Sequence, residues 1–192
     1  MTTQNSTLLN QYKQAFRLAL GDEITVESSD LYDTNENKTF TADSIAFFFK
    51  TVEQTKAFKD TILPIVRLYD ALLHRIPDPV GFAFWIDRYQ STRSLVLIAD
   101  ALTNSSEFKY KWLNVTEEAM INNLYLRLLG RLADRQGMTS ALTSLSRKEI
   151  ALSDLTVLLM TAEDPEIFQT DTMIALTKRF FYNLYINIFC SE

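Results

Sequence analysis

The feature that most constrains the fold is a motif that the chain repeats. The segments LYDALLHRIPDPVG (68–81) and LYLRLLGRLADRQG (124–137) align without a gap at an offset of 124 − 68 = 56 residues. Leu, Tyr, Leu, Leu, Arg, Asp and Gly occupy the same places in both segments. A third, partial copy begins at Leu184-Tyr185, at an offset of 184 − 124 = 60 residues. Repeats of this length predict helical units that stack and share a core.

Each full copy has the signals of a helix, a tight turn and a second helix. Apolar residues recur at spacings of three and four, which is the pattern of a helix with one apolar face. Gly130 suits a left-handed helix end, Asp78 and Asp134 suit the cap of the next helix, and Pro79 suits a first helical position. The recurring Arg75/Asp78 and Arg131/Asp134 pairs are therefore interpreted as structural rather than as a functional charge site. The apolar positions are Ile62, Ile65, Val66, Tyr69, Leu72 and Leu73 in the first copy and Ile121, Leu124, Tyr125, Leu128 and Leu129 in the second.

Further helices are expected after each hairpin, so the predicted fold is all-α. In the first copy a helix is expected at about 93–103, and SSEF (105–108) starts a short one. In the second copy SRKE (146–149) has the capping-box pattern and predicts a helix at about 147–161. The expected organisation is an N-terminal helical element (1–60) with a polar loop (22–40), repeats at 61–115 and 116–176, and the start of an incomplete third repeat at 177–192.

Composition excludes several classes of protein. The chain has 192 residues, a formal net charge of −5 and a pI near 5.0, whereas nucleic-acid binding needs a cluster of Lys and Arg. No apolar run approaches the roughly 20 residues that span a bilayer, so no transmembrane segment is expected. The polar N-terminus lacks the features of a Sec signal peptide. We therefore expect a protein that is either cytoplasmic or exported by a route whose signal lies elsewhere.

An enzyme is not expected. The chain has one histidine, His74, and one cysteine, Cys190, which lie at equivalent helix ends of different repeats. A Cys–His pair would need both side chains within hydrogen-bond reach. His74 is better interpreted as a helix C-terminal residue, near the negative end of the helix dipole.

Oxygen side chains alternate in the polar loop. Asp33, Asn35, Asn37 and Thr39 have the spacing with which a calcium loop surrounds its ion. Lys38 stands where an EF-hand needs glycine, so the segment is not an EF-hand. Two interpretations stay open: an irregular calcium site, with calcium as the only candidate cofactor, or an Asx-rich turn that caps the next helix.

A second candidate site is the segment EFKYKWLN (107–114). Lys109, Tyr110, Lys111 and Trp112 place two ammonium groups beside aromatic rings, a combination that suits a sugar or a phosphorylated glycan. The alternative is a short connecting helix that packs Trp112 between the repeats.

The pattern Leu-Tyr-x-x-x-Leu-Gly-Arg-x-x-Asp-x-x-Gly at 124–137, with FAFW and SSEF after the first copy, resembles a helical repeat family of unknown function. That family occurs in RTX-type secreted and surface-layer proteins of Gram-negative bacteria and is similar to phycobilisome linker domains. The resemblance covers about residues 60–192. His74 and Cys190 replace the turn glycine, Ala141 stands where Trp85 would recur, and no Gly-rich calcium nonapeptide is present.

The N-terminal order of elements is similar to the anchoring region of RTX-type surface-layer proteins. A helix at 8–21, a polar loop and the segment SIAFFFKTVEQTKAF (44–58) precede the first repeat. This resemblance implies a non-enzymatic module that leaves the cell by type I secretion, binds lipopolysaccharide O-polysaccharide at the cell surface and contacts neighbouring surface-layer subunits. Calcium dependence is typical of that class. The phycobilisome likeness implies the alternative, a linker or scaffold that organises partner proteins by helix packing.

Overall fold

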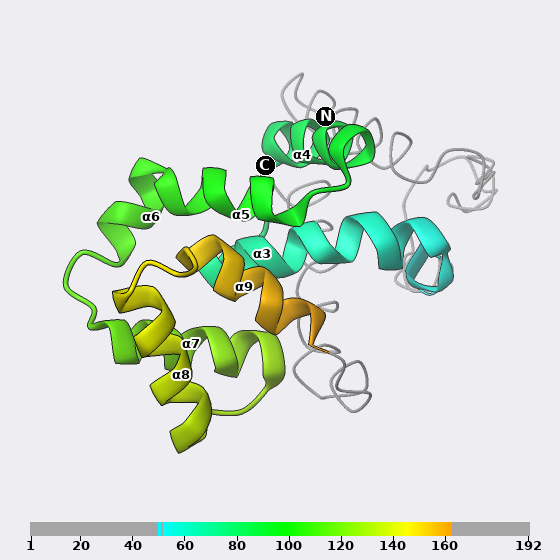
Figure 1. The fold of residues 1–192 in the computed structure, drawn as a ribbon. Helices are drawn as coiled ribbons and strands as arrows, with labels where there is room; N and C mark the ends of the chain where they lie inside the picture. The colour runs from blue at the N-terminus through cyan, green and yellow to red at the C-terminus, as the bar shows by residue number, and fades with distance from the viewer. Residues whose placement is uncertain (1–49, 51, 163–192) are drawn as a thin grey trace, which may run out of the picture.

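The structure is a computed structural model that describes residue 50 and residues 52–162 (Figure 1). No strand occurs among these residues, and the prediction of an all-α fold is confirmed. None of their helices combines the length and apolar character that a membrane span needs. The N-terminal element up to residue 49, with its loop at 22–40, and the incomplete third repeat lie outside the described residues. The elements are η2 (Phe58–Ile62), α3 (Leu63–Leu73), α4 (Pro79–Thr92), α5 (Leu95–Asn104), α6 (Ser106–Lys111), α7 (Glu117–Leu129), α8 (Arg135–Ser146) and α9 (Leu152–Thr161).

The two predicted hairpins turn at equivalent residues. α3 is followed by His74 at φ 54° and α7 by Gly130 at φ 69°, both left-handed and 130 − 74 = 56 residues apart. Asp78 then caps α4, and Asp134 caps α8, again 56 residues on (134 − 78). The turn chemistry of the sequence is confirmed, with a histidine taking the left-handed position of the first copy.

The repeated tyrosine, arginine and glycine pack against one another in the first hairpin. The Arg75 guanidinium lies over the Tyr69 ring, 5.1 Å from its centroid, and reaches Asp78 at 3.6 Å. Asp78 Oδ1 accepts a hydrogen bond from the Gly81 backbone N–H at 2.9 Å. A Cβ on Gly81 would lie only 3.0 Å from the Tyr69 hydroxyl, so the motif needs glycine there to let the two helices approach.

The second hairpin repeats this arrangement at every motif position. The Arg131 guanidinium lies 5.7 Å from the Tyr125 centroid and 3.9 Å from Asp134, which accepts from the Gly137 N–H at 2.7 Å. Tyr69 and Tyr125 thus share these contacts, and in both hairpins the Asp caps the second helix, as the structural interpretation of the Arg/Asp pairs predicts. The motif is a set of contacts that joins two helices.

The predicted helix at 147–161 is wrong at its start. α8 continues to Ser146, whose hydroxyl donates back to the Thr143 carbonyl at 2.9 Å instead of capping a new helix. Lys148 then takes a left-handed φ of 56°, and α9 begins only at Leu152. Asp154 supplies the capping contact, accepting from the Ala151 N–H at 2.8 Å.

Four helices close the core. α3 packs on α5, α5 on α9, α9 on α7 and α7 on α3, while α8 packs on α7, and α4 packs on η2, α3 and α5. Figure 1 shows α3 and α5 running one way and α7 and α9 the other. Asp70 of α3 contacts Arg127 of α7, and His74, which follows α3 one turn later, contacts Asn123, one turn earlier on α7. Equivalent helices of the two repeats therefore run antiparallel. One repeat is thus rotated relative to the other, and the two pack face to face.

One buried arginine joins three of these helices. Arg67, only 5% exposed on α3, donates to the Leu128 carbonyl of α7 at 3.1 Å and to the Met160 carbonyl of α9 at 3.2 Å. Carbonyls in the last turn of a helix have no N–H partner within it, and a positive charge suits that end of the dipole. Burial lowers the pKa of Arg67 to about 10, which still leaves it charged at neutral pH.

Arg67→Ala is expected to lower the free energy of unfolding by about 2–4 kcal/mol, because two buried carbonyls lose a charged donor. Denaturant unfolding followed by circular dichroism measures the change. Arg88→Ala, at an exposed position of α4, is the control and should change stability by less than about 0.5 kcal/mol. Equal stabilities of the two variants would contradict the role of Arg67.

Gly137→Ala is expected to destabilise the second hairpin by about 1–3 kcal/mol, because the new Cβ would lie 2.6 Å from the Tyr125 hydroxyl. Tyr125→Phe removes the clashing oxygen, so the double variant should recover part of the loss. Thermal unfolding of the three variants provides the comparison. A double variant no more stable than Gly137→Ala would show that the clash arises elsewhere.

Candidate functional site

The predicted glycan segment falls on the short helix α6, between α5 and α7 (Figure 1). Lys109, Tyr110 and Lys111 are exposed, Tyr110 to 84%. Trp112 is only 7% exposed. The four residues therefore do not form one surface, because the chain turns the last of them into the core.

Trp112 anchors α6 to α3. Its indole N–H donates to the Leu72 carbonyl at 2.8 Å, and its ring meets His74 edge-on at 5.1 Å. Leu72 is the equivalent of Leu128 (128 − 72 = 56), so each first helix of a hairpin has a last-turn carbonyl bonded by a buried side chain. Trp112 is therefore packed inward, as the connecting-helix interpretation expected, but these contacts are within the first repeat and not between the repeats. The ring is not available to stack on a sugar.

A bidentate ion pair holds the other end of α6. Arg75 Nε donates to Glu107 Oε1 at 2.7 Å and Arg75 Nη2 to Oε2 at 2.9 Å. The hydrogen bonds from Arg75 hold the pKa of Glu107 below its ordinary value. Both side chains are about 40% exposed, so solvent screens the pair and its main effect is on orientation. Lys109, Tyr110 and Lys111 thus project from a helix that is fixed at both ends.

The His74 side chain connects the two repeats through a contact with Asn123. Its Nε2 lies 2.9 Å from Oδ1 of Asn123, and because an amide oxygen only accepts, Nε2 carries the proton. Burial lowers the pKa of His74, and the nearby positive charge of Arg127 lowers it further. His74 is thus held neutral, although it caps a helix C-terminus. Cys190 lies outside the described residues, so the expectation of no Cys–His pair stays a prediction.

A charged pair that the sequence pattern did not single out lies beside the His74–Asn123 contact. The carboxylate of Asp70, which is buried on α3, accepts from Arg127 of α7 at 2.9 Å. α3 is buried nearly all round, since it contacts helices on several sides. The sequence signal that could have found this pair was a charged residue inside an otherwise apolar helix, because a buried charge needs a partner.

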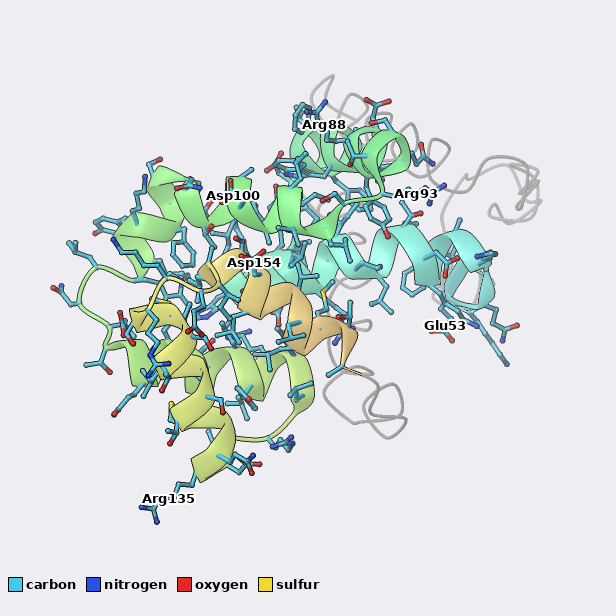
Figure 2. The ribbon with its side chains drawn as sticks, viewed as in Figure 1. Glu53, Arg88, Arg93, Asp100, Arg135 and Asp154 are labelled. Atoms are coloured by element: carbon cyan, nitrogen blue, oxygen red, sulfur yellow. The ribbon has the colours of Figure 1, made fainter. Side chains whose placement is uncertain are left out.

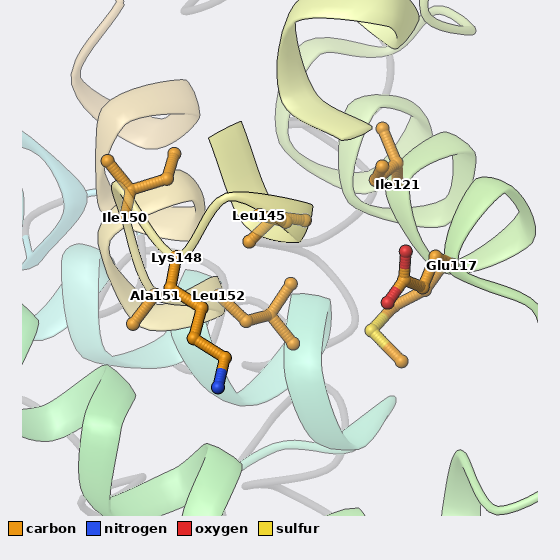
Figure 3. Close-up of a pocket in the computed structure, with 8 residues that line it drawn as sticks. Glu117, Ile121, Leu145, Lys148, Ile150, Ala151 and Leu152 are labelled. Atoms are coloured by element: carbon orange, nitrogen blue, oxygen red, sulfur yellow. The ribbon is translucent and has the colours of Figure 1, made fainter. Parts of the chain in front are cut away.

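The described surface also has a pocket that no motif predicted. Its volume is about 470 Å³, and it lies between the start of α7, the end of α8 and the start of α9 (Figure 3). The lining is mainly aliphatic, with one carboxylate and one ammonium group. The residues come from three elements, so no single stretch of sequence has its pattern. They are Glu117, Met120, Ile121, Leu145, Lys148, Ile150, Ala151 and Leu152.

The candidate calcium ligands Asp33, Asn35, Asn37 and Thr39 lie outside the described residues, so that site stays a prediction. Between residues 52 and 162, no cluster of three or more His, Cys, Asp or Glu side chains could hold a metal ion. Nothing in this part of the chain replaces the loop as a metal candidate.

Comparison with known proteins gives one match. Residues 99–163, about a third of the chain, match the model of a domain of unknown function (DUF4214). The matched segment runs from within α5 through α9 and contains α6, the second hairpin and the pocket. No curated protein and no solved structure matches the chain. The match places these features within one recognised domain and assigns them no activity.

Acid is expected to weaken the His74–Asn123 contact and so to lower the stability of the fold. With its folded pKa below the ordinary 6.5, neutral His74 contributes stability that is fully present above pH 6.5 and is lost as the pH falls through the folded pKa. His74→Asn removes the titration and suits the left-handed backbone. The urea midpoint should fall more for the natural chain than for His74→Asn between pH 7.5 and pH 5, since His74 is the chain's only histidine. Parallel pH profiles would contradict this expectation.

Proposed function

We propose that this chain is a non-enzymatic anchoring module of a type I-secreted, RTX-type surface-layer protein, and that it binds lipopolysaccharide O-polysaccharide on the outer membrane. The observation that carries the proposal is the exposure of three consecutive residues of α6. Lys109, Tyr110 and Lys111 are presented there by a helix that Trp112 and the Arg75–Glu107 pair attach to α3. A fixed helix loses little conformational freedom on binding, which favours affinity.

The chemistry of these three exposed side chains suits an acidic or phosphorylated sugar. The two ammonium groups supply charge and hydrogen-bond donors, and the Tyr110 ring supplies an apolar face with a polar edge. The chain as a whole is acidic, with a net charge of −5, so its average field repels an anionic membrane. Recognition therefore depends on local cations, or on calcium that bridges protein and glycan.

Weak contacts are sufficient for such an anchor. In a surface layer, neighbouring subunits hold one another, and the second and later contacts of the lattice form at high effective concentration. The proposed partners are thus O-polysaccharide on one side and other surface-layer subunits on the other. The proposed location is extracellular, at the cell surface.

The test is co-sedimentation of the purified chain with cells of its own species and with a strain that lacks O-polysaccharide, with and without calcium. Lys109→Glu/Lys111→Glu should weaken binding at least about tenfold, because two attractive contacts become repulsive. Arg88→Glu/Arg135→Glu is the matched control, with the same change of charge on α4 and α8 (Figure 2). Equal binding to both strains, or equal loss in both variants, would contradict glycan recognition.

A second candidate function is a linker or scaffold that organises partner proteins. It is favoured by α4, where Val80 and Phe84 are 64% and 58% exposed. Residues four apart share one face of a helix, so the two side chains form an apolar patch that another helix could cover. Binding to a defined protein, with no dependence on O-polysaccharide, would favour this candidate.

A further inference from the structure

The pocket lies at the open end of the α7–α8 hairpin, away from the turn that joins the two helices (Figure 3). Ile121 and Leu145 form part of its lining, together with Ile150 of the segment before α9 and Leu152 at the start of α9. Glu117 and Lys148 bring a negative and a positive side chain to the same pocket. The site is thus a half-open apolar groove with charges of both signs.

The equivalent end of the first hairpin is completed by η2. Tyr69 lies against the beginning of α4, where it approaches Gly81 and accepts a hydrogen bond from Trp85. Ile62 and Phe58 continue the same stripe toward the N-terminus, at spacings of seven and eleven residues from Tyr69. Both are buried, and α4 packs against η2. Large apolar side chains therefore extend this hairpin past the start of α3.

The second hairpin lacks these two side chains. The equivalents of Ile62 and Phe58 are Glu118 (62 + 56) and Asn114 (58 + 56), and both are exposed. α7 begins at Glu117, directly after the loop that follows α6, so no helical extension corresponds to η2 in the described chain. The groove occupies the end of the hairpin at which the first repeat has η2.

We propose that this groove binds an amphipathic helix of a partner protein, which places a large apolar side chain where the first repeat has Phe58. Charge complementarity sets its orientation, with a basic residue of the partner toward Glu117 and an acidic one toward Lys148. The η2 region has both kinds of residue beside Phe58, namely Lys59 and Asp60. The inference names a binding site for the scaffold candidate and is independent of glycan recognition by α6.

The probe is a stapled helical peptide with the sequence of residues 52–63, titrated into the full chain. A staple is needed because an isolated helix of this length is marginal in water. Methyl NMR signals of Met120, Ile121 and Leu145 should shift in a saturable way. A peptide with Phe58→Ala should bind at least about tenfold more weakly, because the buried ring provides most of the contact. Absence of shifts at millimolar peptide, or equal binding of both peptides, would overturn the proposal.

Variants of the full chain locate the site. Ile150→Glu should weaken peptide binding at least about tenfold, whereas Leu158→Glu, an exposed position of α9, should leave it unchanged. Peptide binding that ignores Ile150→Glu would overturn the assignment. So would shifts of the same methyls on concentrating the chain alone, because a second copy would then be the occupant. Co-sedimentation with cells is a separate readout, so failure here leaves glycan binding standing.

Discussion

The packing of this domain depends on the Arg67 guanidinium, which bonds the last turns of two helices at once. Burying a charge is costly, and hydrogen bonds to well-placed acceptors offset part of that cost. Leu128 and Met160 offer carbonyls that their own helices cannot satisfy, at the negative ends of two dipoles. The ends of α7 and α9 are therefore held on α3. The Asp70–Arg127 and His74–Asn123 contacts then set how α7 lies along α3.

The repeated motif builds the hairpins, and the differences between the hairpins lie outside it. Trp85 donates to the Tyr69 hydroxyl at 2.9 Å, whereas the second copy has Ala141 at the equivalent place. In both copies the arginine lies over the tyrosine ring, and the glycine faces the tyrosine hydroxyl closely enough that a Cβ would collide with it. The candidate binding features, on α6 and in the groove, use residues outside the repeated motif at 68–81 and 124–137. The repeated positions thus build the hairpins, and residues outside them form the candidate surfaces.

The candidate glycan segment shows both the reach and the limit of sequence patterns. Exposure of Lys109 and Lys111 follows from their charge, and the structure agrees. Trp112 has two roles open to it in the sequence, and its spacing of four from buried Phe108 is the signal that places both rings on one face. The groove had no such signal, because its lining comes from residues that meet only when α7, α8 and α9 pack together.

The sequence by itself determined the helix–turn–helix of each hairpin and the caps at its turn, because these rest on bonds between residues close in the chain. Asp78 and Asp134 each accept a hydrogen bond from the backbone N–H three residues later, a spacing that can be read directly from the sequence. Only the tertiary structure decided that the two units face each other, that Trp112 is buried and that a groove stays open beside α7. Those features rest on contacts such as those of Arg67, to partners 61 and 93 residues away. Many ways of packing helices that are far apart in the chain would satisfy the same apolar pattern. The directions of the helices and the hydrogen bonds of buried polar groups select one of them.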